Sequence, residues 1–440
     1  MTIAILIALF LFLIFIGSPV SVALGGSVIL TSYFLDPMPI AIVGQKIFAN
    51  LDHFTLMAVP FFFFAAALME TGGLVKRLVK LANSLVGHWT GGLGVTTVLS
   101  CVLFASISGS SPATVAAVGK LMYPALIKEG YKSRYALGAI VTAGSIGILI
   151  PPSIPMIIYG FVTETSVARL FMAGIIPGII YAIGMMFMAR YLAKKDGNIL
   201  RPKASWKSRI EATRSAGPAL MLPIIIVFGI YGFPQFDILG FHYSGGAVFT
   251  PTEASIIATV LAIIVGMFIY KELSVKSAIR TIVKTAPGAG MIFFITTNAL
   301  LFAYFITKLG IPQAVTQFVV SLDMPQWAFL LLINFIFLII GFFLEGVPVV
   351  LMFVPVIFPA AMQMGIDPVH FGIIVILNIE LGLVTPPVGL NLFVGSAITK
   401  QPIREVFMGA LPWMIVTVIT LFLVTYIPKL STYLPNLIYN

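Results

Sequence analysis

Charged residues are scarce in this chain. Asp, Glu, Lys and Arg together make up 9% of its 440 residues, whereas about a quarter of the residues in an ordinary soluble domain are charged. Hydrophobic residues make up 60%, and they occur in long continuous runs rather than in the short alternating segments of an outer-membrane barrel. The composition therefore excludes a soluble globular protein and predicts an all-α polytopic membrane protein.

Cysteine is also nearly absent. Cys101 is the single cysteine, which excludes a disulfide framework and a cysteine-based zinc or iron–sulfur site. The four histidines are too scattered to match a metal-ligand spacing. Gly119-Lys120 lacks the upstream glycine and the downstream Ser or Thr of an ATP-binding loop. We therefore expect no organic cofactor. The energy is expected to come from an ion gradient or from the gradient of the substrate itself.

Basic residues exceed acidic ones, and the net charge is +10. In a soluble protein this excess would indicate nucleic acid, but in a membrane protein basic residues mark cytoplasmic loops, so no nucleic-acid partner is expected. The apolar segment at residues 3–16 has neither a basic leader nor an Ala-x-Ala cleavage site. It is interpreted as a retained first helix and not as a signal peptide.

Two double prolines interrupt strongly apolar segments. Pro151-Pro152 and Pro386-Pro387 lie 235 positions apart. Proline removes a backbone donor and clashes with the preceding turn, so each pair predicts a helix broken inside the membrane, over about residues 135–162 and 370–397. Freed backbone groups are tolerated there only where they face protein, an ion or water. Two matched breaks indicate the binding site of a secondary transporter.

The separation of 235 positions relates other residues as well, and eight of the nine matches are Gly or Pro. Shared glycines and prolines indicate a shared backbone shape, so the chain is interpreted as two structural repeats, residues 1–215 and 216–440. The matched pairs are Pro124/Pro359, Gly130/Gly365, Gly147/Gly382, Pro151/Pro386, Pro152/Pro387, Gly160/Gly395, Arg169/Arg404, Gly174/Gly409 and Pro177/Pro412.

Each half also contains a longer apolar region with a kink at its centre. These regions span about residues 92–127 and 327–363, interrupted at residues 106–112 and 345–348. Each arm has about 16 residues, fewer than the ~20 that cross a bilayer. We interpret both as re-entrant helical hairpins, with ordinary spanning helices and tight loops as the alternative. Other helices are expected near residues 2–16, 20–34, 53–70, 168–193, 216–232, 251–270, 287–306 and 405–428.

The distribution of basic residues predicts the topology. By the positive-inside rule, the open end of the first hairpin faces the cytoplasm and the open end of the second faces the outside. Each half then has five crossings, and this odd number inverts the second half. The result places 21 of the 25 Lys and Arg residues on the cytoplasmic side and both termini in the periplasm. Two amphipathic segments, Lys76–Val86 and Lys271–Lys284, are expected to brace the cytoplasmic surface or to be solvated connecting helices.

The interruptions carry the candidate binding residues, because hydroxyl and freed carbonyl oxygens suit a small alkali cation. The positive end of the half-helix after Pro387 points toward the centre, where it suits an anionic substrate. A single Ser or Thr here can instead bond to its own helix. The expected Na⁺ ligands are Ser106, Ser108, Ser110, Gly144, Ser145 and Gly147 in the first half, and Glu345, Gly346, Asn378, Gly382 and Thr385 in the second. The expected substrate contacts are Ser111, Thr114, Pro152 and Asn391.

Four carboxylates lie in or beside apolar segments, namely Glu70, Glu253, Glu345 and Glu380. An ionised carboxylate at the centre of a bilayer costs at least about 2.5 kcal/mol. Glu345 is placed at a hairpin tip, where it could neutralise a cation. Glu253 follows Thr250-Pro251-Thr252 and is interpreted as the carboxylate of a helix start.

Two other functional classes stay open. Re-entrant hairpins also fit an ion channel or passive pore. Ser108 with His370 as its base would fit an intramembrane hydrolase, although nothing in the sequence pairs them.

Several motifs together resemble one known family, the large membrane subunit of the tripartite ATP-independent periplasmic (TRAP) transporters. The resemblance covers nearly the whole chain, and Glu345 stands where this family more often has Asp, which keeps the charge. The motifs are MAVPFF at residues 57–62, SGSSPATVAAVG at 108–119, PPSI at 151–154, GGAVFTPTEA at 245–254 and GLVTPPVGLNLF at 382–393.

The resemblance implies Na⁺-driven import of a small organic acid, such as a C4-dicarboxylate, sialic acid or sugar acid, across a bacterial inner membrane. It implies two partners, a periplasmic substrate-binding protein and a small four-helix membrane subunit, which is expected as a separate chain. It also implies an elevator motion, in which the hairpins and broken helices move as one block against a scaffold of the other helices.

Overall fold

The computed structural model of this protein describes residues 2–35, 39–197, 201–232, 236–238, 241–243 and 246–439. The described chain is helical, apart from turns and one short antiparallel pair of strands, β1 (Phe236–Ile238) and β2 (Phe241–Tyr243). Eight of the described helices are long and apolar enough to cross a membrane. The prediction of an all-α polytopic membrane protein is confirmed.

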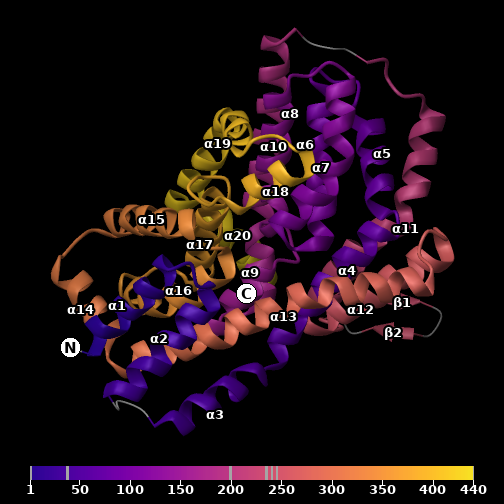
Figure 1. Cartoon of the computed structure of the whole chain (residues 1–440). Coiled ribbons are helices and arrows are strands. Elements are labelled where there is room, and N and C mark those ends of the chain that lie inside the picture. The colour runs from indigo at the N-terminus through magenta and orange to yellow at the C-terminus, as the bar shows by residue number, and fades with distance from the viewer. Residues whose placement is uncertain are drawn as a thin grey trace.

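One group of helices is arranged around α13 (Val275–Lys308), which runs across the lower part of the molecule in Figure 1. Helices α2, α3 and α4 pack directly on α13, α12 packs on α4 and α11, and α1 packs on α2. We call this group the scaffold. Its other members are α1 (Thr2–Phe15), α2 (Val20–Leu35), α3 (Ile40–Leu51), α4 (Ala58–Thr71) with the short helix η1 (Phe54–Met57) before it, α11 (Trp206–Tyr231), and α12 (Pro251–Ile264), continued by a π-helical turn, η3 (Val265–Ile269).

Two scaffold helices differ from the sequence prediction. The segment Lys271–Lys284 does not form a separate surface helix. From Val275 onward, this segment is the first part of α13. Pro287 lies inside α13, and a single proline removes only one backbone hydrogen bond while packing holds the helix together. Helix α11 begins at Trp206, since Ser205 accepts the Ser208 N–H (3.2 Å) and caps it. Residue 216, the predicted start of the second half, therefore lies inside a helix.

The hairpins and broken helices form the second group, which we call the core block. The first hairpin is α6 (Gly92–Ser108) and α7 (Ser111–Lys128), and the second is α15 (Gln326–Phe343) and α16 (Gly346–Gln363). The first broken helix is α8 (Ser133–Gly144), η2 (Ser145–Ile148) and α9 (Ile154–Thr163), and the second is α17 (Pro368–Leu383) and α18 (Leu390–Thr399). Both predicted breaks are confirmed, whereas re-entrance of the hairpins stays a prediction.

The remaining helices surround or connect these groups. Helix α10 (Val167–Lys195) and helix α19 (Ile403–Tyr426) follow the two broken helices. The amphipathic segment Lys76–Val86 lies in α5 (Leu74–Val86), whereas the sequence did not predict α14 (Ile311–Ser321), α20 (Lys429–Tyr439) or α3. These three helices have 11 or 12 residues, too few to produce the long apolar signal of a membrane span.

The two halves meet through reciprocal contacts. Helix α9 of the first half packs on α16 of the second, and the equivalent helix α18 packs on α7. In the same way α8 packs on α19, while α17 packs on α10. A two-fold relation between the repeats produces this pattern. When an element of the first half packs on an element of the second half, the two equivalent elements pack on each other in the same way. The centre of the core block is therefore built from both halves at once.

Each break is held against the tip of a hairpin. The Ile154 N–H donates to the Gly109 carbonyl (3.2 Å), and the Val388 N–H donates to the Phe342 carbonyl (3.1 Å). Both double-proline peptide bonds are cis. One backbone amide at each break thus finds a partner inside the protein, as an irregular segment at membrane depth requires.

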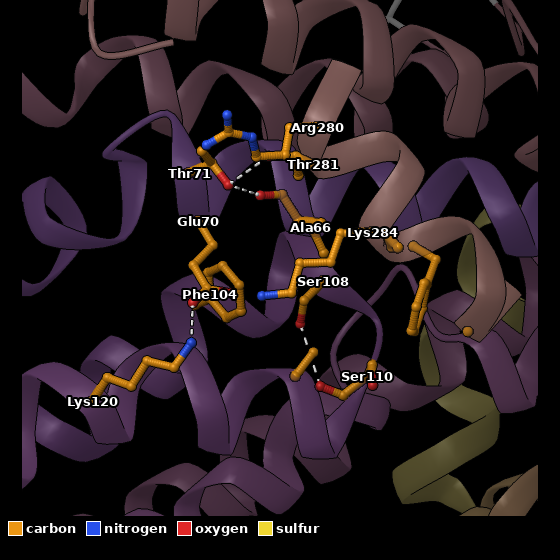
Figure 2. Close-up of a pocket in the computed structure, with 15 residues that line it drawn as sticks. Ala66, Glu70, Thr71, Phe104, Ser108, Ser110, Lys120, Arg280, Thr281 and Lys284 are labelled. Carbon is orange, nitrogen blue, oxygen red and sulfur yellow. Dashed lines mark hydrogen bonds and ion pairs between the residues drawn. The ribbon is translucent and has the colours of Figure 1, made fainter. Parts of the chain in front are cut away.

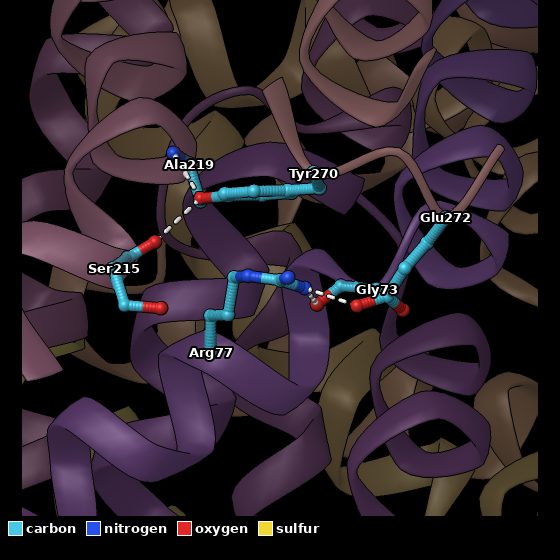
Figure 3. Close-up of polar contacts among 6 residues, drawn as sticks. All are labelled: Gly73, Arg77, Ser215, Ala219, Tyr270 and Glu272. Carbon is cyan, nitrogen blue, oxygen red and sulfur yellow. Dashed lines mark hydrogen bonds and ion pairs between the residues drawn. The ribbon is translucent and has the colours of Figure 1, made fainter. Parts of the chain in front are cut away.

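Helix α5 is fastened to the scaffold by Arg77 (Figure 3). Its guanidinium stacks over the Tyr270 ring at 3.8 Å from the centroid and donates to Glu272 Oε1 (2.7 Å). The Tyr270 hydroxyl donates to the Ser215 carbonyl (2.8 Å) and accepts the Ala219 N–H (3.2 Å) on α11. One stacked pair therefore joins α5, α11 and the turn between α12 and α13. This geometry fits the predicted bracing role of the amphipathic segment Lys76–Val86.

Candidate functional site

A cavity of about 510 Å³ separates the first hairpin from the scaffold (Figure 2). The hairpin contributes Ser108 and Ser110 from its tip and Lys120 from α7. Helices α4 and α13 form the opposite wall. The cavity therefore lies at the boundary between the core block and the scaffold.

The charged part of the lining of this cavity is predominantly basic. Lys120 is paired with Glu70 on α4 (2.6 Å). Arg280 and Lys284 of α13 form no ion pair within the described parts of the chain. Figure 2 shows the Lys284 amine pointing into the cavity beside Ser108. An excess of positive charge that lines a cleft attracts and concentrates anions.

A second, much smaller cavity of about 40 Å³ lies between the tips of the two hairpins. Ser110 and Ser111 line it from the first tip, and Glu345 and Gly346 line it from the second. Ser110 also lines the larger cavity. The tip of the first hairpin therefore stands between the basic cavity and the meeting point of the two halves.

Three oxygens gather at the first hairpin tip. The Ser108 and Thr114 hydroxyl oxygens lie 2.9 Å apart, and the Thr114 hydroxyl donates to the Ser110 carbonyl (2.9 Å). A Cβ atom on Gly147 would lie 2.8 Å from Thr114 Oγ1 and 2.9 Å from the Ser110 carbonyl oxygen. Only glycine lets the backbone of η2 come this close. The sequence correctly predicted that this break would face this tip, and hydroxyl and carbonyl oxygens are the ligands expected for Na⁺.

A separate polar cluster is buried where the halves meet. The Asn391 amide donates to Ser111 Oγ (2.7 Å) and to Ser145 Oγ (3.2 Å), and the Ser111 hydroxyl donates to Glu380 Oε2 (3.4 Å). All four side chains have 0% exposure. We call Ser111, Ser145, Glu380 and Asn391 the central cluster. The sequence had assigned Ser145 to Na⁺ and Ser111 and Asn391 to the substrate, but it did not join these three to one another or to Glu380.

The sequence nevertheless contains a signal for this cluster. Ser145 and Glu380 are 235 positions apart, so they occupy equivalent positions in the two repeats. Equivalent residues near a two-fold axis lie close to each other. The repeat spacing was therefore a signal for this pair, but it did not by itself show that the pair lies near the axis.

The structure places other predicted ligands away from the candidate Na⁺ oxygens. The Ser106 hydroxyl donates to the Leu103 carbonyl (2.8 Å) and the Thr385 hydroxyl to the Leu381 carbonyl (2.6 Å), each within its own helix. This back-bonding is the ordinary alternative for a hydroxyl in an apolar helix. Gly144 packs against Val115. Pro152 brings its carbonyl oxygen against Gly109, where a Cβ atom would lie 2.8 Å away.

The second half does not bring together the set that the sequence proposed. The Asn378 amide donates to Asn334 Oδ1 on α15 (2.8 Å) and to the Ile374 carbonyl (2.9 Å), so it faces the body of the hairpin. Gly382 lies against the backbone of Gly341. At the tip, Gly346 faces Ile379 rather than Asn378. The helical phase of α17 explains this, because adjacent residues of a helix point about 100° apart.

The hydrolase alternative requires Ser108 and His370 to be in contact, and the structure does not pair them. His370 Nδ1 lies 2.7 Å from Ser431 Oγ, while Ser108 is bonded to Thr114. The two residues therefore have different partners, and no nucleophile–base contact joins them.

Broken helices that meet hairpin tips, with a basic cavity beside them, define a polytopic membrane transporter. Residues 7–430 match the family model described as the DctM component of the tripartite ATP-independent periplasmic transporters. The chain belongs to this family, as the motifs had indicated. It is a permease subunit and a multi-pass protein of the bacterial inner membrane.

Relatives of known name agree with this. The chain is 39% identical to the C4-dicarboxylate TRAP transporter large permease protein DctM of Rhodobacter capsulatus, over 100% of both chains. It is 41% identical to the protein of the same name from Pseudomonas aeruginosa, over 94% of each. It is 33% identical to the sialic acid TRAP transporter large permease protein SiaM of Vibrio cholerae, over 97% of this chain and 96% of that one.

Among solved structures, the chain resembles the crystal structure of the YdaH transporter of Alcanivorax borkumensis. The TM-score is 0.64 over 91% of this chain and 89% of that one, at 14% sequence identity. Such a likeness concerns the fold alone.

Proposed function

We propose that this chain is the permease subunit that moves a small organic acid into the cell together with Na⁺. The observation that carries the proposal is the basic cavity, in which Arg280 and Lys284, unpaired within the described residues, lie on the wall opposite the Ser108–Ser110 tip. An anion held there would lie beside the oxygens proposed for Na⁺. Opposite charges on substrate and ion would then stabilise each other's binding.

The substrate class that we favour is a C4-dicarboxylate. Two cations that have no ion-pair partner among the described residues match two carboxylates, and charge-assisted bonds to ionised oxygens are the strongest hydrogen bonds available there. The relatives at 39% and 41% identity carry this substrate in their names. Sialic acid and sugar acids, which have one carboxylate, are the alternatives.

Na⁺ is proposed to bind among Ser108 Oγ, Thr114 Oγ1 and the Ser110 carbonyl oxygen, against the backbone at Gly147. Unwound backbone at the centre of a transporter commonly supplies such ligands. Na⁺ in this position would pull the hairpin tip and the break together, and so would fix the shape of the cavity wall next to the substrate.

Orientation and motion follow from the positive-inside rule. Lys120, Arg280 and Lys284 belong on the cytoplasmic side, so the larger cavity is proposed to face the cytoplasm. Import would then carry the core block past α4 and α13, in an elevator motion between two faces of the membrane. A periplasmic binding protein would deliver the acid, and a small four-helix membrane subunit would complete the complex.

The test is uptake of labelled succinate into proteoliposomes that contain this chain, the small subunit and the binding protein. We expect uptake to require an inward Na⁺ gradient and the binding protein. Uptake at an unchanged rate after K⁺ replaces Na⁺ would contradict the coupling. Rapid flux without the binding protein would instead support the channel alternative.

The basic cavity has a matched pair of variants on one helix. Lys284→Gln removes an unpaired charge from the cavity, and we expect the succinate KM to rise about tenfold, since the loss of one charged hydrogen bond costs about 1.5 kcal/mol. Lys276→Gln removes an exposed charge outside the cavity lining, and it should leave the KM unchanged. Equal KM values for both variants would exclude the cavity as the substrate site.

A further inference from the structure

A third cavity, of about 380 Å³, lies where helix α5 meets the beginning of helix α11. Figure 1 shows these two helices side by side, and they pack on each other. Lys80 and Asn83 of α5 line the cavity together with His88, just after that helix, and Arg201 and Ser208 line it from the other side. We call it the α5–α11 cavity. It shares no lining residue with the basic cavity proposed for the substrate.

The charged lining of the α5–α11 cavity is entirely basic within the described chain. Lys80 is exposed and forms no ion pair among the residues that the structure describes. Arg201 is held by Glu129, which lies outside the lining and takes the Arg201 Nε (3.3 Å) and Nη2 groups. The Nη1 group has no partner in the described structure. An ammonium group and an oriented guanidinium are therefore both available to an anion.

The first turn of α11 adds to this positive charge. Ser205 caps the helix, which has 26 residues, and Ala204 and Ser208 on either side of the cap line the cavity. The N-terminus of a long helix presents partial positive charge and unbonded N–H groups. Guanidinium, ammonium and N–H groups together are the donors that phosphate oxygens accept most strongly. The chemistry of the lining therefore favours a phosphate group.

The surroundings of the cavity are those of a membrane surface. Helix α5 buries its apolar face, while Lys80 on its other face is exposed. Large apolar side chains on the same elements are also exposed, namely Leu85 on α5, Trp89 just after it and Trp206 at the start of α11. Trp and basic residues gather at the level of the lipid headgroups. A lipid can cover these apolar side chains with its acyl chains, whereas a free phosphate cannot.

The equivalent helix of the second half shows that the lysines are not needed to build this element. Lys76 and Lys80 of α5 correspond to Ile311 and Val315, which lie 235 positions further on in α14. Helix α14 contains no charged residue. The same short helix between scaffold and hairpin therefore forms without basic side chains, and the charge at the α5–α11 cavity is a feature of one half only.

We propose that the α5–α11 cavity binds the phosphate headgroup of an anionic phospholipid, and that the bound headgroup holds the end of α5 against the start of α11. Helix α5 follows the scaffold helix α4 and precedes α6 of the first hairpin, and it packs on both α6 and α11. A headgroup between Lys80 and Arg201 would therefore fix the connection through which the scaffold reaches the hairpin. The inference goes beyond the proposed function and depends on neither the substrate nor Na⁺.

The first test is native mass spectrometry of the purified permease complex in detergent, titrated with phosphatidylglycerol or with phosphatidylcholine. We expect phosphatidylglycerol to bind more tightly, and Lys80→Gln to raise its Kd about tenfold through the loss of one charge-assisted hydrogen bond. The matched control is Lys76→Gln, one turn earlier on α5, which removes an exposed charge outside the lining and should leave the Kd unchanged. Equal Kd values for the two variants, or equal binding of the two lipids, would overturn the inference.

Competition separates a lipid from a soluble phosphate. Inorganic phosphate and glycerol 1-phosphate at millimolar concentration should leave phosphatidylglycerol bound, because neither covers the exposed apolar side chains. Displacement of the lipid by either compound would overturn the lipid assignment and indicate a site for a soluble phosphate.

Hydrogen exchange tests the effect on α5. In nanodiscs that contain phosphatidylglycerol, we expect the amides of residues 85–92 to exchange more slowly than in nanodiscs of phosphatidylcholine alone. Lys76→Gln should keep this difference, and Lys80→Gln should lose it. Equal exchange of the unmodified protein in the two lipids would overturn the inference. Neither measurement involves transport, so a failure of Na⁺-coupled uptake would refute the proposed function alone.

Discussion

The two breaks have the same double proline and the same contact to a hairpin tip, yet their surroundings differ. Pro151 and Pro152 are buried, whereas Pro387 and Val388 are exposed. At the first tip, the Ser108 and Thr114 hydroxyl groups are hydrogen-bonded to each other. The second tip presents Glu345, an exposed residue whose side chain does not cap α16. Repeated backbone shape has therefore produced one sealed site and one accessible site.

This difference shows how a symmetric fold can serve a directional process. Glycine and proline preserve the geometry of both breaks, while the polar residues around them are not repeated. Ser145 and Glu380 stand at equivalent positions, but one is a neutral donor and the other an acid. The shared shape places each break against a hairpin tip, and the unshared side chains decide which polar contacts each half makes.

The strongest test of the comparison exchanges glycine for alanine at the equivalent positions 147 and 382. A Cβ on Gly382 would lie 2.6 Å from the carbonyl carbon and oxygen of Gly341, which are backbone atoms of a neighbouring helix. We expect Gly382→Ala to lower the Tm most, because overpacking costs about 1–3 kcal/mol and a helix backbone yields little. Gly147→Ala should lower it less, since its nearest contacts are longer, at 2.8 Å to Thr114 Oγ1 and 2.9 Å to the Ser110 carbonyl oxygen.

Thermal unfolding of the purified protein measures both variants. Gly290→Ala on α13 is the control, since a Cβ there would meet no atom within 4 Å, and alanine is favoured over glycine inside a helix by about 0.5–1 kcal/mol. A Tm for Gly382→Ala equal to that of Gly290→Ala would show that α15 and α17 do not pack as described.

The next largest effect concerns Na⁺ at the sealed tip. Thr114→Val keeps the shape of the side chain and removes its hydroxyl oxygen, and we expect the Na⁺ concentration for half-maximal uptake to rise about tenfold, equivalent to about 1.4 kcal/mol. Ser106→Ala removes a hydroxyl bonded to its own helix and should change this concentration little. If both variants behave alike, Na⁺ does not bind at this tip.

The smallest expected effect lies at the surface, where the halves also differ. Glu129, after the first hairpin, pairs with Arg201, and the hydrogen bond from Arg201 lowers the pKa of its carboxyl. The equivalent position in the second half is Met364, so no such pair exists there. Because the folded-state pKa lies below the unfolded value, the pair stabilises the fold above the unfolded pKa and loses this effect as the pH falls through the folded one.

We therefore expect acid to lower the Tm of the unmodified protein slightly more than that of Arg201→Gln. The difference should be small, since exposed ion pairs contribute about 0–1 kcal/mol. Thermal unfolding at pH values on both sides of the carboxyl titration measures it, and a larger acid loss in Arg201→Gln would contradict the assignment.

The membrane class, both breaks, the repeat and the family could all be predicted from the sequence. These conclusions depend on local properties, because proline and glycine shape the backbone wherever they occur and apolar length alone distinguishes a membrane helix. The sequence also paired the first tip correctly with Gly147. It did not predict that α13 continues through Pro287, because packing on the neighbouring helices outweighs one lost hydrogen bond.

Which polar side chains meet depends on the packing of the folded chain. Ser106 and Ser108 are two residues apart on one helix, yet one bonds to its own turn and the other reaches Thr114. Asn378 faces α15, whereas Glu380 joins Ser111 across 269 positions. A hydroxyl or amide can bond within its helix or across to another, and the choice depends on helix phase and on neighbours that are distant in the chain. The polar contacts between the two halves arise only when both halves are packed together.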